Sequence, residues 1–125
     1  MINAKAIYAE LLTNEKITAL VSEDNIMSSW PNEKVENFPC IIFTDDNQSD
    51  TEYWENKPGA SSCSVMIHIF SKKLDGYATT TEIAEVIAEV MNDNLWHCSR
   101  NGEMADPDPD VEHRVMAFNT SIFYN

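Results

Sequence analysis

Three aspartates at alternate positions are the first group in this chain that could do chemistry. Asp106, Asp108 and Asp110, with a proline between each pair, resemble the start of a calcium-binding loop. Such a loop also needs glycine at its sixth position and a bidentate glutamate at its twelfth. Those positions hold Val111 and Ala117 here. We therefore expect a solvated loop stiffened by its prolines, and no calcium site.

The histidines are the next candidates for chemistry. His68, His97 and His113 stand in separate segments, and none has a metal-ligating neighbour two to four residues further on. His68 is expected at the surface, on the outer side of a strand. A zinc site built from His97, Cys98 and the distant His113 is a minor alternative.

Cysteines and glycines indicate no cofactor and no catalytic centre. The three cysteines are widely spaced and odd in number, which fits neither a disulfide framework nor a zinc motif. Cys40 and Cys63 lie in apolar strand patterns and are expected to be reduced and packed. Three glycines supply no phosphate-binding loop, and no G-x-S-x-G stretch is present. We therefore expect a protein that is not an enzyme and holds no cofactor.

Aromatic residues outside the periodic segments are candidates for protein contacts. Trp30, Tyr53 and Trp54 fall in expected loops or loop tips. Tyrosine and tryptophan are favoured at protein interfaces, although local packing over the sheet is an alternative. With Asp106, Asp108 and Asp110, they form the candidate interface set.

The charge balance restricts the partners of this chain. Eight basic residues against 21 acidic ones give a net charge of −13. Phosphate binding needs a basic face, so nucleic acid and acidic membrane surfaces are poor partners. The charge favours basic proteins, or an acidic wall past which DNA slides, although a merely solvated surface is the plainer alternative. No apolar run reaches the about 20 residues of a membrane helix, and no secretory signal is visible, so we expect a cytosolic protein.

Helical patterns begin the chain, whose 125 residues are expected to form one domain, residues 1–125. A first helix is predicted over Asn3–Thr13 from apolar residues at helical spacing. A second, short helix is predicted to start at Asn14, with Ile17, Leu20 and Val21 facing inward. The following segment, Ile26–Phe38, is expected to be a loop or a weak edge strand.

The strands and the main helix define the expected core. Ser61–Ser71 alternates, which predicts a strand with Val65, Ile67 and Ile69 beside Cys63 on its core face. A helix over Thr79–Asn94 opens with the capping box Thr79-x-x-Glu82, and its apolar stripe should rest on that strand. Further strands are predicted at Cys40–Thr44, Leu95–Ser99 and Val111–Tyr124, with a loop at Arg100–Asp110.

These elements predict an α+β fold. It should contain a mostly antiparallel sheet of about four strands, with two N-terminal helices and one amphipathic helix packed on it.

The order of these segments resembles the tail completion, or tail-to-head joining, proteins (tail terminators) of long-tailed phages and prophages. Ile2–Leu12 and Asn14–Val21 resemble the two opening helices of that family. Phe38–Phe43 resembles its Y-P-x-I-x-Y strand, and Val65–Ser71 resembles its V-x-I-x-I-W-S strand. The acidic helix Glu82–Met91 and a long last strand complete the order. The chain departs from the family pattern at Asn47–Ala60 and Arg100–Asp110.

The resemblance implies a structural, non-enzymatic protein. Members of the family cap the head-proximal end of the finished tail tube, often as a hexameric ring, and present a surface to the head connector. The implied partners are further copies of the chain, the tail tube protein and the connector protein. DNA would pass through the ring without specific binding. The protein would be found in the host cytoplasm during assembly and then at the tail–head junction of the virion.

Two other functions compete with this one. An acidic inhibitor or adaptor that mimics DNA would be a monomer or dimer bound to a basic DNA-handling protein. A small hydrolase using paired acids would need a deep pocket with a carboxylate of raised pKa, and the sequence gives it no support.

Overall fold

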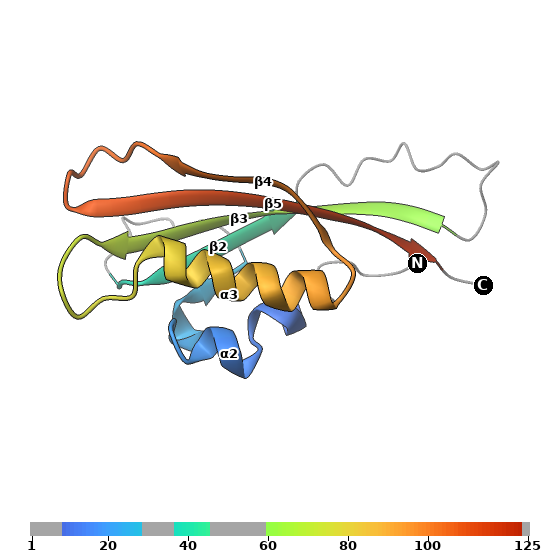
Figure 1. Cartoon of the computed structure of the whole chain (residues 1–125), viewed down its shortest axis with the longest axis horizontal. Helices are drawn as coiled ribbons and strands as arrows, with labels where there is room; N and C mark the ends of the chain where they lie inside the picture. Colours follow the sequence, from blue (N-terminus) through green and yellow to red (C-terminus); the bar gives the residue numbers. More distant parts are fainter. Residues whose placement is uncertain (1–8, 29–36, 46–59, 124–125) are drawn as a thin grey trace.

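The sheet and the helices on it are seen in a computed structural model that describes residues 9–28, 37–45 and 60–123 (Figure 1). The strands are β1 (Ile26–Met27), β2 (Cys40–Asp45), β3 (Ala60–Lys72), β4 (His97–Met104) and β5 (Val111–Phe123). They form a five-stranded sheet in the order β1-β2-β3-β5-β4. All pairs are antiparallel except β1 with β2. The α+β class predicted from the sequence is confirmed, with a mixed sheet because the two-residue edge strand β1 runs parallel to its neighbour.

Strands β3 and β5 form the long centre of the sheet. Each has 13 residues, and they pair along their full length, with Ile67 opposite Met116 and His68 opposite Val115. Alternation of side chains across a strand places every second residue on the same face. Of the β3 side chains that were predicted to face the core, Val65, Ile67 and Ile69 are fully buried, and that of Cys63 lies outside the described side chains.

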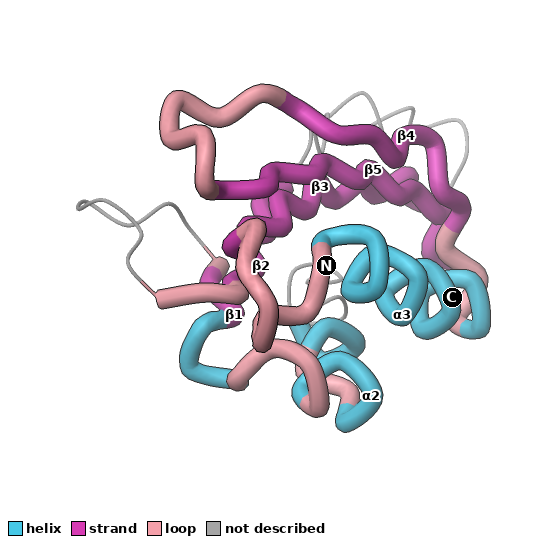
Figure 2. Tube along the Cα trace, turned by 60° about the vertical axis from the view of Figure 1, so that its left-hand side comes forward, coloured by secondary structure: helices cyan, strands magenta, loops and turns pink. Residues whose placement is uncertain are grey.

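The helices lie on one face of the sheet (Figures 1 and 2). They are a helical turn at residues 9–12, α2 (Glu15–Thr18), the short 3-10 helix η1 (Glu23–Asn25) and α3 (Thr80–Asp93). Asn14 caps α2 by accepting a hydrogen bond from the Lys16 amide, as expected for a helix that starts there. Of the predicted first helix, residues 3–8 lie outside the described part of the chain.

The main core lies between α3 and the inward face of the sheet. Ile83, Ile87 and Met91 of α3 pack in the same buried cluster as Ile67 of β3 and Phe118 of β5. Burying each such side chain contributes about 1.5–3 kcal/mol. Glu82, Glu85 and Glu89 remain exposed, so the predicted two-sided character of this helix is confirmed.

The opposite face of the sheet carries a second, smaller apolar cluster. It contains Cys40, Ile42, Phe70 and Val111. Since Ile41 and Phe43 are buried on the helix face, β2 is covered on both faces, which agrees with its continuous apolar run. Burial in this cluster raises the pKa of the free Cys40 thiol to about 12.

Strand β4 is longer than the sequence predicted. The sequence indicated a strand at Leu95–Ser99 and a loop at Arg100–Asp110, whereas the strand continues to Met104 and the loop is residues 105–110. The segment contains Asn101-Gly102, a pair typical of turns. It is extended here because it pairs with β5, after a register shift between Cys98 and Arg100.

Candidate interaction surface

The loop of residues 105–110, which joins β4 to β5, is shaped by hydrogen bonds of its aspartate side chains. Oδ1 of Asp106 accepts a hydrogen bond from the Asp108 amide at 2.9 Å, and Oδ1 of Asp108 accepts one from the Asp110 amide at 2.9 Å. Aspartates that bond to the backbone two residues on form Asx turns. Two such turns in succession, with prolines between, give the loop a defined shape.

Backbone hydrogen bonds connect this loop to the sheet. The Val111 amide donates to the Asp108 carbonyl at 3.1 Å, and the Lys73 amide, just after β3, donates to the Asp110 carbonyl at 2.9 Å. The loop is therefore held both at the start of β5 and at the end of β3.

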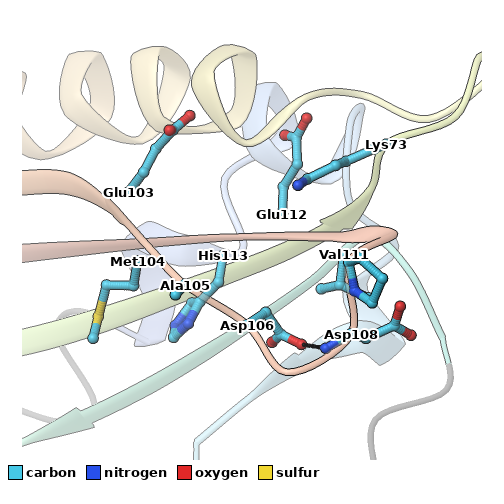
Figure 3. A pocket seen from close by; sticks show the side chains of 10 residues that line it. Lys73, Glu103, Met104, Ala105, Asp106, Asp108, Val111, Glu112 and His113 are labelled. Carbon is cyan, nitrogen blue, oxygen red and sulfur yellow. Dashed lines mark hydrogen bonds between the residues drawn. The ribbon is translucent and has the colours of Figure 1, made fainter.

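A cavity of about 290 Å³ lies beside this loop (Figure 3). We call it the hairpin pocket. Its carboxylates come from β4, the loop and β5, and its single lysine follows β3. The residues that line it are Lys73, Glu103, Met104, Ala105, Asp106, Asp108, Pro109, Val111, Glu112 and His113.

Glu112 links the hairpin pocket to the start of α3. Its Oε1 accepts hydrogen bonds from the Thr80 amide at 3.0 Å and from the Thr80 hydroxyl at 3.2 Å. The Thr79 hydroxyl oxygen accepts from the Glu82 amide at 3.1 Å, which confirms the predicted cap. A carboxylate at a helix N-terminus is favoured by the helix dipole, so the position of Glu112 is fixed by the fold.

Arg114 holds the neighbouring edge of the sheet against α3. Its guanidinium donates to the Asn101 side-chain oxygen at 3.0 Å and to the Thr81 hydroxyl at 3.1 Å. Glu103, at the pocket, lies 3.5 Å from the same guanidinium. The buried Nε of Arg114 has no hydrogen-bond partner among the described residues. The network places Glu103 beside the pocket while leaving its side chain largely exposed.

Two histidines meet on the sheet face away from α3. Nδ1 of His68 and Nε2 of His113 are 3.0 Å apart, and the His113 ring stacks on Phe70 with centroids 4.2 Å apart. Burial lowers the pKa of His68, and the charges of His113 and Arg100 lower it further. Burial also lowers the pKa of His113, although Asp106 acts in the opposite direction. Both rings therefore favour the neutral form.

The structure brings together half of the residues predicted to form an interface. Asp106, Asp108 and Asp110 share one loop, and two of them line the hairpin pocket. Trp30, Tyr53 and Trp54 lie outside the described residues, so their role remains a prediction.

The histidines differ from their predicted arrangement. His97 lies opposite Asn119 while His113 lies opposite Met104, at the other end of β4, so they do not form the zinc site that we considered. His68 is half-buried against His113 instead of standing at the surface. Within the described ranges, no group of three or more His, Cys, Asp or Glu residues is arranged to hold a metal ion.

Local sequence patterns indicated neither the pairing of His68 with His113 nor the position of Lys73 and Glu112 at the pocket. A signal was present for the histidines, since each follows the alternation of its strand. Their meeting depends on the register of β3 with β5, which local patterns do not specify.

Fold and surface together define a class: a small α+β protein whose acidic loop at residues 105–110 is hydrogen-bonded to the sheet. None of the described helices has the length and apolar character needed to cross a membrane. The family described as "Tail completion protein gp17" matches residues 5–124. The chain therefore belongs to this family of phage tail completion proteins, and it is a structural tail protein.

Further comparisons concern curated sequences and solved structures. No curated protein matches the sequence. The fold is similar to that of a chain in the virion of a native gene transfer agent particle, with a TM-score of 0.59 and 16% sequence identity. That similarity covers 95% of this chain and 93% of the other. At this identity it supports a shared fold.

Proposed function

We propose that this protein caps the head-proximal end of the finished tail tube and joins the tail to the head connector. The observation that carries the proposal is the family match, which extends over residues 5–124. The similarity in fold to a chain of a virion particle agrees with it. The role is structural and needs no catalytic group.

The proposed assembly is a ring of copies of this chain, with six as the expected number. A ring closes when each subunit contacts the next through two different surfaces. Its partners are the tail tube protein on one side and the head connector protein on the other. The protein assembles in the host cytoplasm and ends at the tail–head junction of the virion.

The net charge of −13 suits such a ring. DNA that passes through a channel with acidic walls is repelled and does not stick. The same charge favours a basic surface on the protein partners, since opposite charges guide association.

The experiment that tests the proposal uses a phage with a stop codon early in this gene. We expect its lysate to contain filled heads and separate tails. Purified protein added to that lysate should restore complete particles, counted by electron microscopy and by plaque titre. Complete particles in the lysate without added protein would contradict the proposal.

A second function, mimicry of DNA, is favoured by the same net charge of −13. In that role the protein would be a monomer or dimer bound to a basic DNA-handling protein. Affinity capture from infected cells separates the two functions. Recovery of tail tube and connector proteins supports the first, whereas recovery of a DNA-binding enzyme alone supports the second.

A further inference from the structure

Exposed apolar side chains gather at one end of the sheet. Four large hydrophobic residues of the described chain are exposed: Leu74, Tyr77, Leu95 and Met104. Leu74 and Tyr77 belong to the segment that follows β3, and Met104 ends β4. We call these three residues the apolar tip. Single exposed hydrophobic residues are ordinary, whereas several at one place mark a contact site.

The register of the strands places the parts of the apolar tip near one another. Lys72, the last residue of β3, pairs with Val111, and Met104 pairs with His113, two residues further along β5. The loop of residues 105–110 is also hydrogen-bonded to the chain that leaves β3. Figure 1 shows the segments that follow β3 and β4 at the same end of the molecule.

The segment between β3 and α3 has a defined shape. The Ser71 hydroxyl donates to the Ala78 carbonyl at 2.6 Å and closes the base of the segment. The Tyr77 amide donates to the Leu74 carbonyl at 3.4 Å, and Gly76 between them has φ +96°, which glycine adopts without strain. Because this backbone is formed before a partner arrives, binding costs less conformational entropy.

Carboxylates surround the apolar tip. Asp75 lies in the same turn, and the loop of residues 105–110 carries three more aspartates. Lys73 lines the hairpin pocket among four carboxylates, and Nζ of Lys72 lies 4.7 Å from the centroid of the Phe38 ring. A partner at this end should therefore bring positive charge, since opposite charges across an interface favour association.

We propose that the apolar tip docks into an apolar recess, bordered by basic side chains, on the tail tube protein at the end of the tube. Tyrosine and methionine are enriched at protein interfaces. The tail tube is the expected partner because the chain belongs to a family of tail completion proteins. A second copy of this chain fits less well, since it would bring further negative charge to an acidic end. This inference rests on the proposed function and names the surface that meets the tube.

The test is co-sedimentation of the purified protein with tail tubes from a phage that lacks this gene product. Leu74→Ser should bind these tubes roughly tenfold more weakly than the wild type, because it removes an apolar side chain from the contact. Leu95→Ser is the matched control and should bind like the wild type. It makes the same change at a leucine that is 83% exposed, against 59% for Leu74, beyond the C-terminal end of α3. Equal binding by the two variants would overturn the proposal.

A second variant and the salt concentration test the two parts of the contact separately. Tyr77→Ser should weaken binding by a similar factor, and both tip variants should unfold at the temperature of the wild type, because they change exposed side chains. Binding by the wild type should weaken as salt rises from about 0.05 M to about 0.5 M, since salt screens the attraction between opposite charges. Binding that ignores salt would contradict the basic border of the recess.

Binding to isolated head connectors separates this inference from the proposed function. If Leu74→Ser binds tubes less well and connectors normally, the apolar tip is the contact with the tube. If it loses the connectors instead, or keeps its binding to both, the tip does not contact the tube and the joining function stands. If the wild type binds neither tubes nor connectors, the proposed function fails, and the partner named for the tip fails with it.

Discussion

The contact between His68 of β3 and His113 of β5 should make the stability of the protein depend on pH. Their ring nitrogens are 3.0 Å apart on neighbouring strands. One of the two rings must donate and the other accept, which a doubly protonated pair cannot do. Burial lowers the pKa of both rings, the charges of His113 and Arg100 lower that of His68 further, and Asp106 only partly offsets the lowering at His113.

The stability of the protein should therefore fall as the histidines of the unfolded chain become protonated. Below the ordinary pKa of 6.5, the unfolded chain binds more protons than the folded one, so the free energy of unfolding decreases with decreasing pH. The stabilisation that comes from the neutral histidines is present above pH 6.5 and is lost as the pH falls below it. Thermal unfolding followed by circular dichroism should give a steeper decrease for the wild type than for His113→Phe between about pH 7.5 and about pH 5.

The comparison of variants removes the effect of the many carboxylates, which titrate in both proteins. His97→Phe serves as the control, because His97 is exposed and lies at the opposite end of β4. It should retain the pH dependence of the wild type. A His113→Phe variant with an unchanged pH dependence would show that the pair does not affect stability.

The backbone of Leu95 is strained, just after the C-terminal end of α3. It has φ +66° and an exposed side chain at the turn into β4, and the left-handed region costs a residue with a Cβ about 1–2 kcal/mol. Leu95→Gly removes that strain, although glycine adds about 0.5–1 kcal/mol of chain entropy to be lost. We expect a net gain of about 0.5 kcal/mol in urea unfolding. A loss of stability would contradict this interpretation.

At the scale of elements, α3 depends on caps from two sources. Thr79 caps it from within, and Glu112 of β5 accepts from Thr80. Thr79→Ala should reduce the free energy of unfolding by about 1 kcal/mol. Glu112→Ala should reduce it by about 1–3 kcal/mol, because a charged acceptor is lost from a partly buried amide.

Urea unfolding of both variants measures these losses. Glu85→Ala, an exposed change in the same helix, is the control and should alter the free energy by less than about 0.5 kcal/mol. If Glu112→Ala matched this control, the contact between β5 and the helix N-terminus would contribute nothing to stability.

Elements with a strong local pattern were predicted from the sequence. The capping box and apolar stripe of α3 and the alternation of β3 gave their positions closely. The second half of β4 was not predicted, because Arg100–Met104 has no apolar alternation and is a strand only through its pairing with β5. Long-range pairing of this kind overrides local preference.

Of the candidate site, only the loop can be compared with its prediction, and its part in an interface remains a prediction. The aspartates with intervening prolines indicated a stiff, solvated loop, and the structure confirms the loop. The hairpin pocket could not be predicted, because Lys73 and Glu112 reach it from the ends of β3 and β5. Their approach is set by the register of strands far apart in sequence.

At the scale of the whole molecule, the helices cover one face of the sheet (Figure 1), and the acidic residues of α3 are exposed. A subunit of this kind can present its acidic surface to DNA or to a basic neighbour while its core is complete on its own. In the proposed ring, we expect contacts with other proteins to be made by loops and strand ends. A weak contact between subunits would be strengthened by the tube that aligns them.

We propose above all that this protein binds the end of a tail tube as a ring. The most direct measurement is light scattering of the purified protein over a concentration series, with and without tail tubes of its own phage. We predict a hexamer, or a monomer that binds at tube ends and saturates at a fixed number of copies per tube. A monomer that ignores the tubes at every concentration would contradict the account.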